Sequence, residues 1–279
     1  ARLLKKKPLQ IAEELKAALS GRYDAQVLPP GFLNFRLKDG ELMEAAERIC
    51  SDESYFADPA RAAERVNVEF VSANPTGPMH LASGRGATLG DSLARIMSFL
   101  GSRVEKEFYV NNIGKQVELL GLSLKARLLG DEPPEGGYKG AYLRDIAARL
   151  PKEASGWTDK QFSDHALNEM LVLHKADMKA FGVEFDRWFL ESELHAAGRP
   201  AKVKAELTKR GMTYERDGAV WLGTSSGMDS DDKDRVLVKS DGRNTYFLND
   251  IAYHQDKFER GFTKVVDVWA RTITVTCPG

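Results

Sequence analysis

The run from Glu69 to Gly90 combines the residue types that an anion-binding site needs. It reads Glu-Phe-Val-Ser-Ala-Asn-Pro-Thr-Gly-Pro-Met-His-Leu-Ala-Ser-Gly-Arg-Gly-Ala-Thr-Leu-Gly, so a strand end, a loop with Pro and Gly, and a helix start follow one another. Ligands of parallel α/β sheets bind at the carboxyl ends of strands, and helix N-termini favour anions. We therefore expect a phosphate-bearing ligand here, with His80 donating hydrogen bonds to phosphate oxygens. On spacing alone, the pattern also fits an ordinary strand-turn-helix connection in which His80 only caps the helix.

The segments around this run are typical of a parallel α/β sheet. Residues 66–71 and 104–110 are predicted strands, and residues 80–100 form a long helix between them. Another helix begins near residue 114. This succession of strand, loop, helix, strand and helix predicts parallel strands joined by right-handed crossovers.

The strand pattern returns near the end of the chain. Residues 235–239 and 264–269 are predicted strands. Between them, a turn at Asp241-Gly242 leads to residues 245–248, where a strand is expected to give way to a helix that runs through Phe258.

Two other parts of the chain depart from this pattern. Residues 8–19 predict an amphipathic helix, and residues 26–37 break at a Pro-Pro-Gly turn and then alternate as strands do. We assign both to a small α+β N-terminal domain, residues 1–65. Because the first residue is Ala rather than Met, we expect this domain to be incomplete at its start or the chain to be processed. The sheet domain covers residues 66–279, with a mainly helical insertion at about residues 131–232.

Composition excludes several classes of protein. The chain has 279 residues, 42% of them hydrophobic, and a formal charge of −1, which predicts a globular protein rather than a disordered chain or a uniformly basic nucleic-acid binder. Its two cysteines, Cys50 and Cys277, lack CxxC spacing, so we expect no disulfide framework and no protein-held metal site. No apolar run reaches the roughly 18 residues of a membrane span, and we expect a cytoplasmic protein that does not contact membranes.

Four segments resemble the arginyl-tRNA synthetases, which are class I aminoacyl-tRNA synthetases with a Rossmann-type catalytic domain. They are Val68–His80, Tyr109–Gln116, Asp232–Val238 and Asp250–Phe262. In addition, Gly31–Phe35 is similar to the family's additional N-terminal domain. The resemblance runs over nearly the whole chain up to Trp269, and it implies that the sheet domain is the Rossmann-type catalytic domain.

The resemblance implies an ATP-dependent ligase. The arginine carboxylate would attack the α-phosphate of ATP to give arginyl-adenylate and pyrophosphate, and the arginyl group would then pass to the 3′ end of tRNA(Arg). ATP and Mg2+ are the implied cofactors, L-arginine and tRNA(Arg) the implied partners, and we expect a monomer. Two alternatives stay open: a class I synthetase for another amino acid, and a catalytically weak relative or fragment that binds arginine or tRNA without activating it.

The residues from His80 to Ser83 stand where the family has its His-Ile-Gly-His signature. Ala82 adds a methyl group where Gly lets the adenine pack closely, and Ser83 supplies one hydrogen bond where a second His assists at the phosphates. We therefore expect weakened ATP activation. By resemblance, His80 and Ser83 are catalytic, and the ATP-binding residues are Thr76, Gly77, His80, Ala82, Ser83 and Gly84.

A pocket that selects a guanidinium needs carboxylates in the guanidinium plane and an aromatic face. Tyr246 and Asp250 are four residues apart, so both point into one pocket if their helix starts early. By resemblance, the arginine-binding residues are Glu69, Ser72, Asn74, Tyr246 and Asp250. From the residues alone, each of them also fits an ordinary structural role.

Three polar residues follow the second predicted strand of the sheet. They are Asn111, Asn112 and Gln116. Their position at a strand end predicts that they line the site, and their position before a helix predicts that they cap it.

The chain departs from the family after Trp269. Relatives typically continue Gly-Ala-Asp-His-His-Gly, then into a Lys-Met-Ser-Lys-type loop and a helical anticodon-binding domain. We expect this chain to be a fragment that lacks them and does not complete aminoacylation. Residues 270–279 read Ala-Arg-Thr-Ile-Thr-Val-Thr-Cys-Pro-Gly. The family segment Gly-Ala-Asp-His-His-Gly-His-Val-Pro-Gly can be written with the codons GGC GCG GAC CAT CAC GGT CAC GTG CCC GG. Deleting the first base of these codons gives the tail of this chain. We interpret it as a frameshifted segment, with a genuine unrelated tail as the alternative, and the codons from position 270 decide between them.

Overall fold

A computed structural model describes residues 4–20, 23–37, 39–224 and 233–269. The chain divides into two compact units, Ala1–Ala57 and Asp58–Gly279. The tail at residues 270–279, for which a frameshift is the predicted origin, lies outside the described residues.

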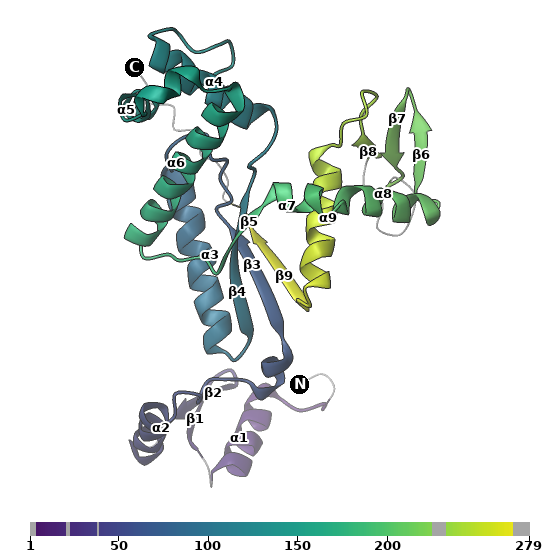
Figure 1. The fold of residues 1–279 in the computed structure, drawn as a ribbon. Helices are drawn as coiled ribbons and strands as arrows, with labels where there is room; N and C mark the ends of the chain where they lie inside the picture. The colour runs from purple at the N-terminus through teal and green to yellow at the C-terminus, as the bar shows by residue number, and fades with distance from the viewer. Residues whose placement is uncertain (1–3, 21–22, 38, 225–232, 270–279) are drawn as a thin grey trace, which may run out of the picture. The chain divides into compact units, whose positions relative to one another are not determined.

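The described part of the first unit combines two helices with a two-stranded antiparallel sheet (Figure 1). Helix α1 (Pro8–Leu19) has the bounds predicted from the sequence and begins with proline, whose fixed φ suits a first helical turn. Strands β1 (Asp24–Leu28) and β2 (Phe32–Arg36) pair around the Pro-Pro-Gly turn, and α2 (Asp39–Ser51) follows. The predicted α+β character of the N-terminal part is confirmed.

Within the described residues, the second unit contains a parallel sheet of four strands in the order β5-β4-β3-β9. These strands are Arg187–Leu190, Arg103–Val110, Arg65–Phe70 and Lys264–Val268, respectively. Figure 1 shows α3 (Leu81–Phe99) along one side of the sheet and α9 (Tyr246–Glu259) along the other. The predicted α/β class with a parallel sheet is therefore confirmed.

One face of this sheet is apolar and packs against α3. Val66, Val68 and Phe70 of β3 alternate toward that face and are almost fully buried. The helix approaches closely because residue 90 is glycine: a Cβ on Gly90 would lie 2.1 Å from Cγ of Phe70. This contact fixes the position of α3 and, with it, the direction of the helix N-terminus.

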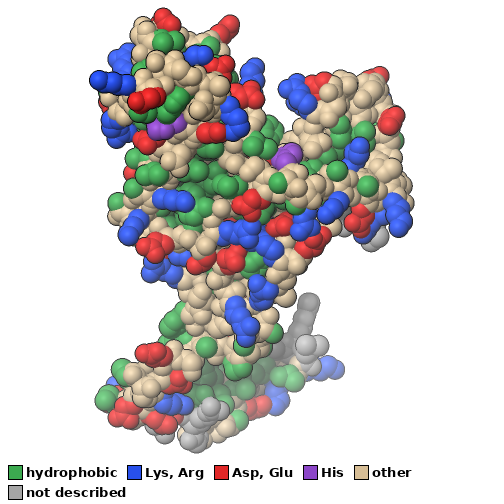
Figure 2. Space-filling model, viewed as in Figure 1, with side chains coloured by type: hydrophobic (Ala, Val, Ile, Leu, Met, Phe, Trp, Pro, Cys, Tyr) green, Lys and Arg blue, Asp and Glu red, His purple; other side chains and the backbone are tan. Residues whose placement is uncertain are grey.

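The opposite face carries a row of acidic side chains. Strand register places Glu107, Glu69 and Asp267 side by side on β4, β3 and β9. Adjacent like charges destabilise a sheet unless they are paired, and α9 supplies the partners. Lys257 Nζ lies 2.6 Å from Glu69 and 2.9 Å from Asp267. Arg260 makes a two-pronged contact with Glu107, at 2.6 and 2.9 Å. Charged side chains of both signs accordingly gather where α9 meets the sheet (Figure 2).

A group of helices lies between β4 and β5 in the sequence. Helices α4 (Lys115–Leu129), α5 (Ala141–Ala148) and α6 (Asp159–Ala180) pack against one another around Leu120, Leu143 and Phe162. Short 3-10 segments occur at Pro59–Ala63 and Lys152–Gly156. In the part of the chain that the structure describes, no helix is both long enough and apolar enough to span a membrane.

The segment predicted as one helical insertion, residues 131–232, is interrupted by a strand of the main sheet. Strand β5 pairs in parallel with β4, so the expectation that this region stays outside the sheet is wrong at residues 187–190. The pairing depends on a strand far away in sequence, which local helical periodicity does not reveal.

The chain after β5 forms a second, smaller sheet. Helices α7 (Glu191–Ala196) and α8 (Arg199–Lys209) precede the antiparallel strands β6 (Thr213–Arg216), β7 (Ala219–Leu222) and β8 (Arg235–Val238). The strand predicted at residues 235–239 is therefore present, but it pairs with β7 and not with the parallel sheet.

The start of α9 also differs from the prediction. Residues 245–248 are expected to end a strand, but Thr245 caps the helix: its hydroxyl accepts the Leu248 N–H at 3.3 Å. The side-chain cap outweighs the β-propensity of Thr-Tyr-Phe. The helix thus starts early, and Tyr246 and Asp250 lie one turn apart on it.

Candidate active site

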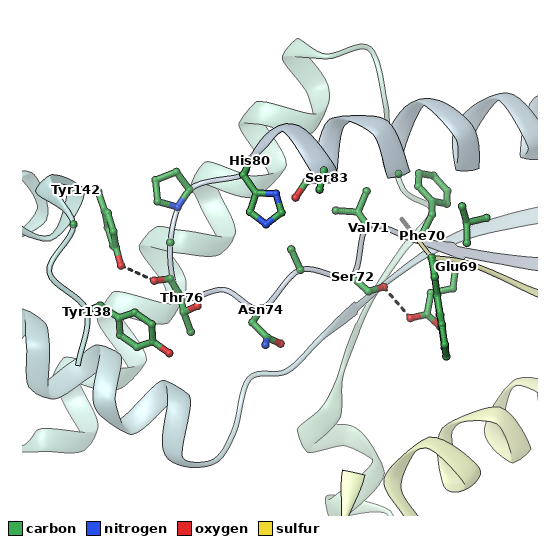
Figure 3. A pocket seen from close by; sticks show the side chains of 18 of the residues that line it. Glu69, Phe70, Val71, Ser72, Asn74, Thr76, His80, Ser83, Tyr138 and Tyr142 are labelled. Carbon is green, nitrogen blue, oxygen red and sulfur yellow. Dashed lines mark hydrogen bonds between the residues drawn. The ribbon is translucent and has the colours of Figure 1, made fainter. Parts of the chain in front are cut away.

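A cavity of about 790 Å³ opens at the carboxyl end of β3 (Figure 3). Its walls come from the ends of β3 and β9, the loop between β3 and α3, and the first turns of α3. Residues 138–140, just before α5, and Tyr142 at the start of that helix complete them. This volume lies in the range of sites for small molecules and cofactors. Eight of the residues predicted from the sequence line the cavity: Glu69, Ser72, Asn74, Thr76, Gly77, His80, Ala82 and Ser83.

The loop leaves β3 through an uncommon backbone conformation. Val71 and Ser72 have φ angles of 66° and 41°, which residues other than glycine rarely adopt, and a β-branched residue such as valine least of all. Such conformations persist where neighbouring contacts hold them. Here Ser72 Oγ donates to Glu69 Oε1 at 2.8 Å and accepts the Tyr109 N–H at 3.1 Å. Ser72 therefore fixes both the path of the loop and the orientation of Glu69.

His80 stands at the N-terminus of α3, but its side chain does not cap the helix. Its backbone is extended, with φ −125° and ψ 174°, and its side chain makes no cap hydrogen bond. The N–H groups of Ser83 and Gly84 instead donate to the His80 carbonyl, at 2.9 and 3.2 Å. His80 is therefore the N-cap residue of α3 through its backbone only, and its side chain takes no part in the cap. Its exposed imidazole lines the cavity beside Ser83, where the helix N–H groups favour an anion.

The two altered signature positions lie on the cavity wall. Ser83 is buried, and Ala82 is half-buried with its methyl group on the wall. Gly84, which the resemblance assigns to ATP binding, does not line the cavity: a Cβ there would lie 3.8 Å from the Phe181 ring. Each residue of an α-helix turns about 100° from the previous one, which carries Gly84 away from the wall that Ser83 occupies.

Glu69 belongs to a network of charged side chains. Its Oε2 accepts from the buried Lys257 and its Oε1 from Ser72. Lys257 also contacts Asp267, which lies 2.7 Å from His254 Nε2. Burial alone would raise the pKa of Asp267, but the hydrogen bond with His254 and the Lys257 cation hold it well below its usual range. The same hydrogen bond raises the pKa of His254.

Tyr246 and Asp250 lie on α9 and not on the cavity wall. The Tyr246 side chain is on the surface, with the residue 69% exposed. Desolvation raises the pKa of Asp250 in spite of nearby cationic side chains, and the carboxylates of Glu69 and Asp267 add to the rise. The structure therefore brings Asp250 close to the acidic row of the sheet and leaves Tyr246 outside it.

A buried carboxylate that the sequence motifs do not predict lies just beyond the end of β5. Glu191 is 4% exposed and accepts a hydrogen bond from Asn249 Nδ2 at 2.7 Å. When the Asn111 amide is oriented so that its oxygen and its nitrogen both have suitable partners, Asn111 Nδ2 donates to the second carboxylate oxygen of Glu191 at 3.0 Å. Burial raises the pKa of Glu191, and the Asp250 carboxylate adds to the rise. Burial also raises the pKa of Tyr109, as do Glu191 and Asp250. Both carboxylates thus raise the pKa of the same aromatic residue.

Asn112 and Gln116 neither line the cavity nor cap α4. Helix α4 begins at Lys115, with Gly114 as its N-cap residue. The Asn112 side chain reaches across to α7, where it accepts the Ser192 N–H at 2.9 Å and donates to Ser192 Oγ at 2.8 Å. Within the described residues, Gln116 Oε1 is buried without a hydrogen-bond partner. Asn112 is therefore a cap, but of a different helix from the one predicted.

The family model described as tRNA synthetases class I (R), catalytic domain, matches residues 46–272. The chain belongs to the class I arginyl-tRNA synthetases. A second model, described as Arginyl tRNA synthetase N terminal domain, matches residues 1–37 of this synthetase chain. The resemblance seen in the sequence motifs is thereby confirmed.

Curated relatives of this synthetase chain are named arginine-tRNA ligase. The relative from Elusimicrobium minutum (strain Pei191) is 49% identical over 276 residues, which is 96% of this chain and 50% of the relative. The one from Shouchella clausii (strain KSM-K16) is 42% identical over 286 residues, with 96% and 51% covered. The chain spans about half the length of the curated relatives it matches.

Solved structures of synthetases agree with the fold. A putative arginyl-tRNA synthetase from Campylobacter jejuni superposes with a TM-score of 0.72 at 33% identity, covering 84% of this chain and 54% of that one. The Thermus thermophilus arginyl-tRNA synthetase gives a TM-score of 0.64 at 26% identity, covering 91% and 45%.

Proposed function

We propose that the chain carries the amino-acid activation site of an arginine-tRNA ligase. The observation that carries this proposal is the cavity at the end of β3, where the N-terminus of α3 and the imidazole of His80 meet in a member of this family. The arginine carboxylate would attack the α-phosphate of ATP, giving arginyl-adenylate and pyrophosphate. Charge increases on the phosphate oxygens in the transition state, and His80 with the α3 N–H groups would stabilise it.

The chemistry of the cavity wall supports ATP as the ligand. Among the described residues that line the cavity, Lys139 is the one permanent cation and Glu69 the one carboxylate. Glu69 is already bonded to Lys257 and Ser72, so the part of the wall that the structure describes offers no spare carboxylate to a metal ion. These residues fit Mg2+ carried on the ATP phosphates rather than Mg2+ held by the protein. When bound, Mg2+ would neutralise phosphate charge.

The acidic groups near the end of the sheet support arginine as the amino acid. The raised pKa values of Asp250 and Glu191 mean that each carboxylate is desolvated without full compensation. A guanidinium would supply that compensation through its planar set of five N–H donors. The α-amino and carboxylate groups of arginine would be held by three residues that line the cavity, Glu69, Ser72 and Asn74.

Transfer of the arginyl group to tRNA(Arg) would be the reaction of the whole ligase, of which this chain matches about half. We propose tRNA(Arg) as the partner of that whole protein, a monomer in the cytoplasm. Ala82 and Ser83 favour a second candidate function, in which the chain binds ATP and arginine but activates the amino acid weakly.

Exchange of labelled pyrophosphate into ATP tests the proposal on the purified chain. We expect exchange that depends on arginine and is not supported by lysine, glutamine or citrulline. Exchange with another amino acid would point to a different class I synthetase. If calorimetry detects binding of arginine and ATP but no pyrophosphate exchange occurs, the second candidate function, binding with weak activation, is favoured. If neither exchange nor binding is found, the proposal is contradicted.

Restoring the family signature is expected to speed activation. In the double variant Ala82→Gly and Ser83→His, the adenine gains room and the phosphates gain a second imidazole, so the exchange rate should rise about tenfold or more. Leu89→His is the control, since Leu89 is exposed on the same helix and does not line the cavity. An unchanged rate in the double variant would show that Ala82 and Ser83 do not limit activation.

A further inference from the structure

The loop between β3 and α3 is held near its far end by two side chains from the helices. Tyr142, on α5, donates its hydroxyl proton to the Thr76 carbonyl at 2.5 Å (Figure 3). His174, on α6, lies with its Nε2 2.7 Å from the Gly77 carbonyl. Thr76 and Gly77 line the cavity just before the turn that leads to His80. Two successive carbonyls of the loop are therefore bonded to helices that are distant in sequence.

The contact made by His174 requires one form of the imidazole. A carbonyl oxygen only accepts hydrogen bonds, so Nε2 must carry the proton. His174 is fully buried, and within the described residues its Nδ1 has no hydrogen-bond partner. Burial lowers the pKa of His174, which keeps the ring neutral with its proton on Nε2. Removing this donor would leave the Gly77 carbonyl without its hydrogen bond, which is costly where water is excluded.

Tyr142 makes a similarly constrained contact. Burial raises the pKa of Tyr142 to about 12, so the hydroxyl keeps its proton and donates it. The ring reaches the loop because residue 140 is glycine: a Cβ on Gly140 would lie 2.2 Å from the Tyr142 ring. The approach of α5 to the loop thus depends on a specific pair of residues at the start of that helix.

The hydrogen bonds that hold the Thr76 and Gly77 carbonyls determine which partial charges the loop presents to a ligand in the cavity. A carbonyl oxygen carries partial negative charge and would repel a phosphate if it turned into the cavity. In a trans peptide the N–H points opposite to the carbonyl, so fixing the Thr76 carbonyl also fixes the direction of the Gly77 N–H. Within the loop itself, the Thr76 N–H donates to the Asn74 carbonyl at 2.8 Å. The side chains of α5 and α6 therefore add a second set of restraints on how the loop faces the cavity.

We propose that Tyr142 and His174 are positioning residues for nucleotide binding. By holding the carbonyls of Thr76 and Gly77 on the helix side, they keep the loop in the form that accepts the phosphates of ATP. The identity of the ligand rests on the proposed function, whereas the restraint on the loop does not. The helices α5 and α6 thereby act on the site through the loop.

Three variants test this proposal on the 279-residue chain, by calorimetric titration with ATP and separately with L-arginine. Tyr142→Phe and His174→Leu each remove one donor and should raise the ATP dissociation constant about tenfold, with the arginine constant unchanged within about twofold. His174→Gln offers an amide N–H near the position of Nε2 and should keep the ATP constant within about threefold. His165→Leu, on the same helix, is the matched control and should leave both constants unchanged.

Amide hydrogen exchange of residues 72–80 gives a readout that needs no ligand. In Tyr142→Phe and His174→Leu, exchange in this loop should be faster, while exchange in α4 and α6 stays the same. If the unaltered chain binds no ATP, the proposed function fails and loop exchange alone decides the role of the two residues. The proposal is overturned if amide hydrogen exchange in residues 72–80 is the same in all variants and in the unaltered chain. It is also overturned if ATP affinity, arginine affinity and unfolding temperature all fall together, because that result indicates a general loss of structure.

Discussion

Asp250→Asn is expected to weaken binding of L-arginine to the chain by about 2–5 kcal/mol, because it removes one partner of a desolvated charge pair. The Asp250 carboxylate is desolvated and lies close to Glu69 and Asp267, so a guanidinium would relieve repulsion as well as form hydrogen bonds. Asn keeps the shape of the side chain and removes only its charge. Calorimetric titration of arginine into the folded variant measures the loss.

Two controls show whether charge is responsible. Citrulline matches arginine in shape but carries a neutral urea group, so the unaltered chain should prefer arginine and Asp250→Asn should prefer it much less. Asp164 is an exposed acid on α6 that pairs with Lys160 at 2.6 Å, and Asp164→Asn should change neither affinity. Unchanged arginine affinity in Asp250→Asn would remove Asp250 from the pocket.

The same binding should depend on pH in a defined direction. Desolvation raises the pKa of Asp250, and burial raises the pKa of Glu191. Arginine binds as a cation, so it favours the ionised carboxylates and lowers their pKa values when it is bound. Arginine affinity should therefore fall as the pH drops through the raised pKa values, and level off above them. Binding in this range should release protons, measured as a heat that varies with the ionisation enthalpy of the buffer, and Asp250→Asn should reduce that release.

The part of the fold that carries the cavity could be predicted because its determinants are local. A strand is predicted at residues 66–71 and observed at Arg65–Phe70, and a helix is predicted at 80–100 and observed at Leu81–Phe99. Alternating apolar residues, a loop with Pro and Gly, and helical periodicity are all properties of neighbouring residues. The same holds for α1, whose bounds match the prediction.

Strand β5 could not be predicted in this way. Its four residues follow a long helical region, and they form a strand because they pair with β4. Missing β5 also hid Glu191, since a residue at the carboxyl end of a parallel strand is recognisable only once the sheet is assembled. The hydrogen bonds of Asn112 could not be predicted for the same reason, because its partner Ser192 also follows β5.

The buried charge at Lys257 is a second feature that depends on distant residues. In the sequence it is a lysine in an amphipathic helix, which normally lies at the surface. Its partner Glu69 is 188 residues away, and the register of β3 with β9 brings the Asp267 carboxylate beside Glu69. Only the assembled sheet creates the acidic row that a lysine on α9 can neutralise.

Replacing Lys257 with Met is therefore expected to destabilise the folded chain by about 3–5 kcal/mol, because it leaves buried charges unpaired. The Lys257 side chain is 0% exposed and its Nζ bridges Glu69 and Asp267. Met retains an unbranched stem of similar size, so the loss reports on charge more than on packing. The free energy of unfolding in urea, followed by circular dichroism, measures the effect.

Matched variants separate charge from packing. Lys160→Met removes a lysine from an exposed pair and should change the free energy of unfolding by at most about 0.5 kcal/mol. Adding Glu69→Gln and Asp267→Asn to Lys257→Met removes the unpaired carboxylates and should recover part of the lost stability. If Lys257→Met alone is as stable as the parent chain, the acidic row does not need its cation. The position of α9 would then be set by ring contacts such as that of Tyr253 with Phe189, whose centroids are 4.8 Å apart.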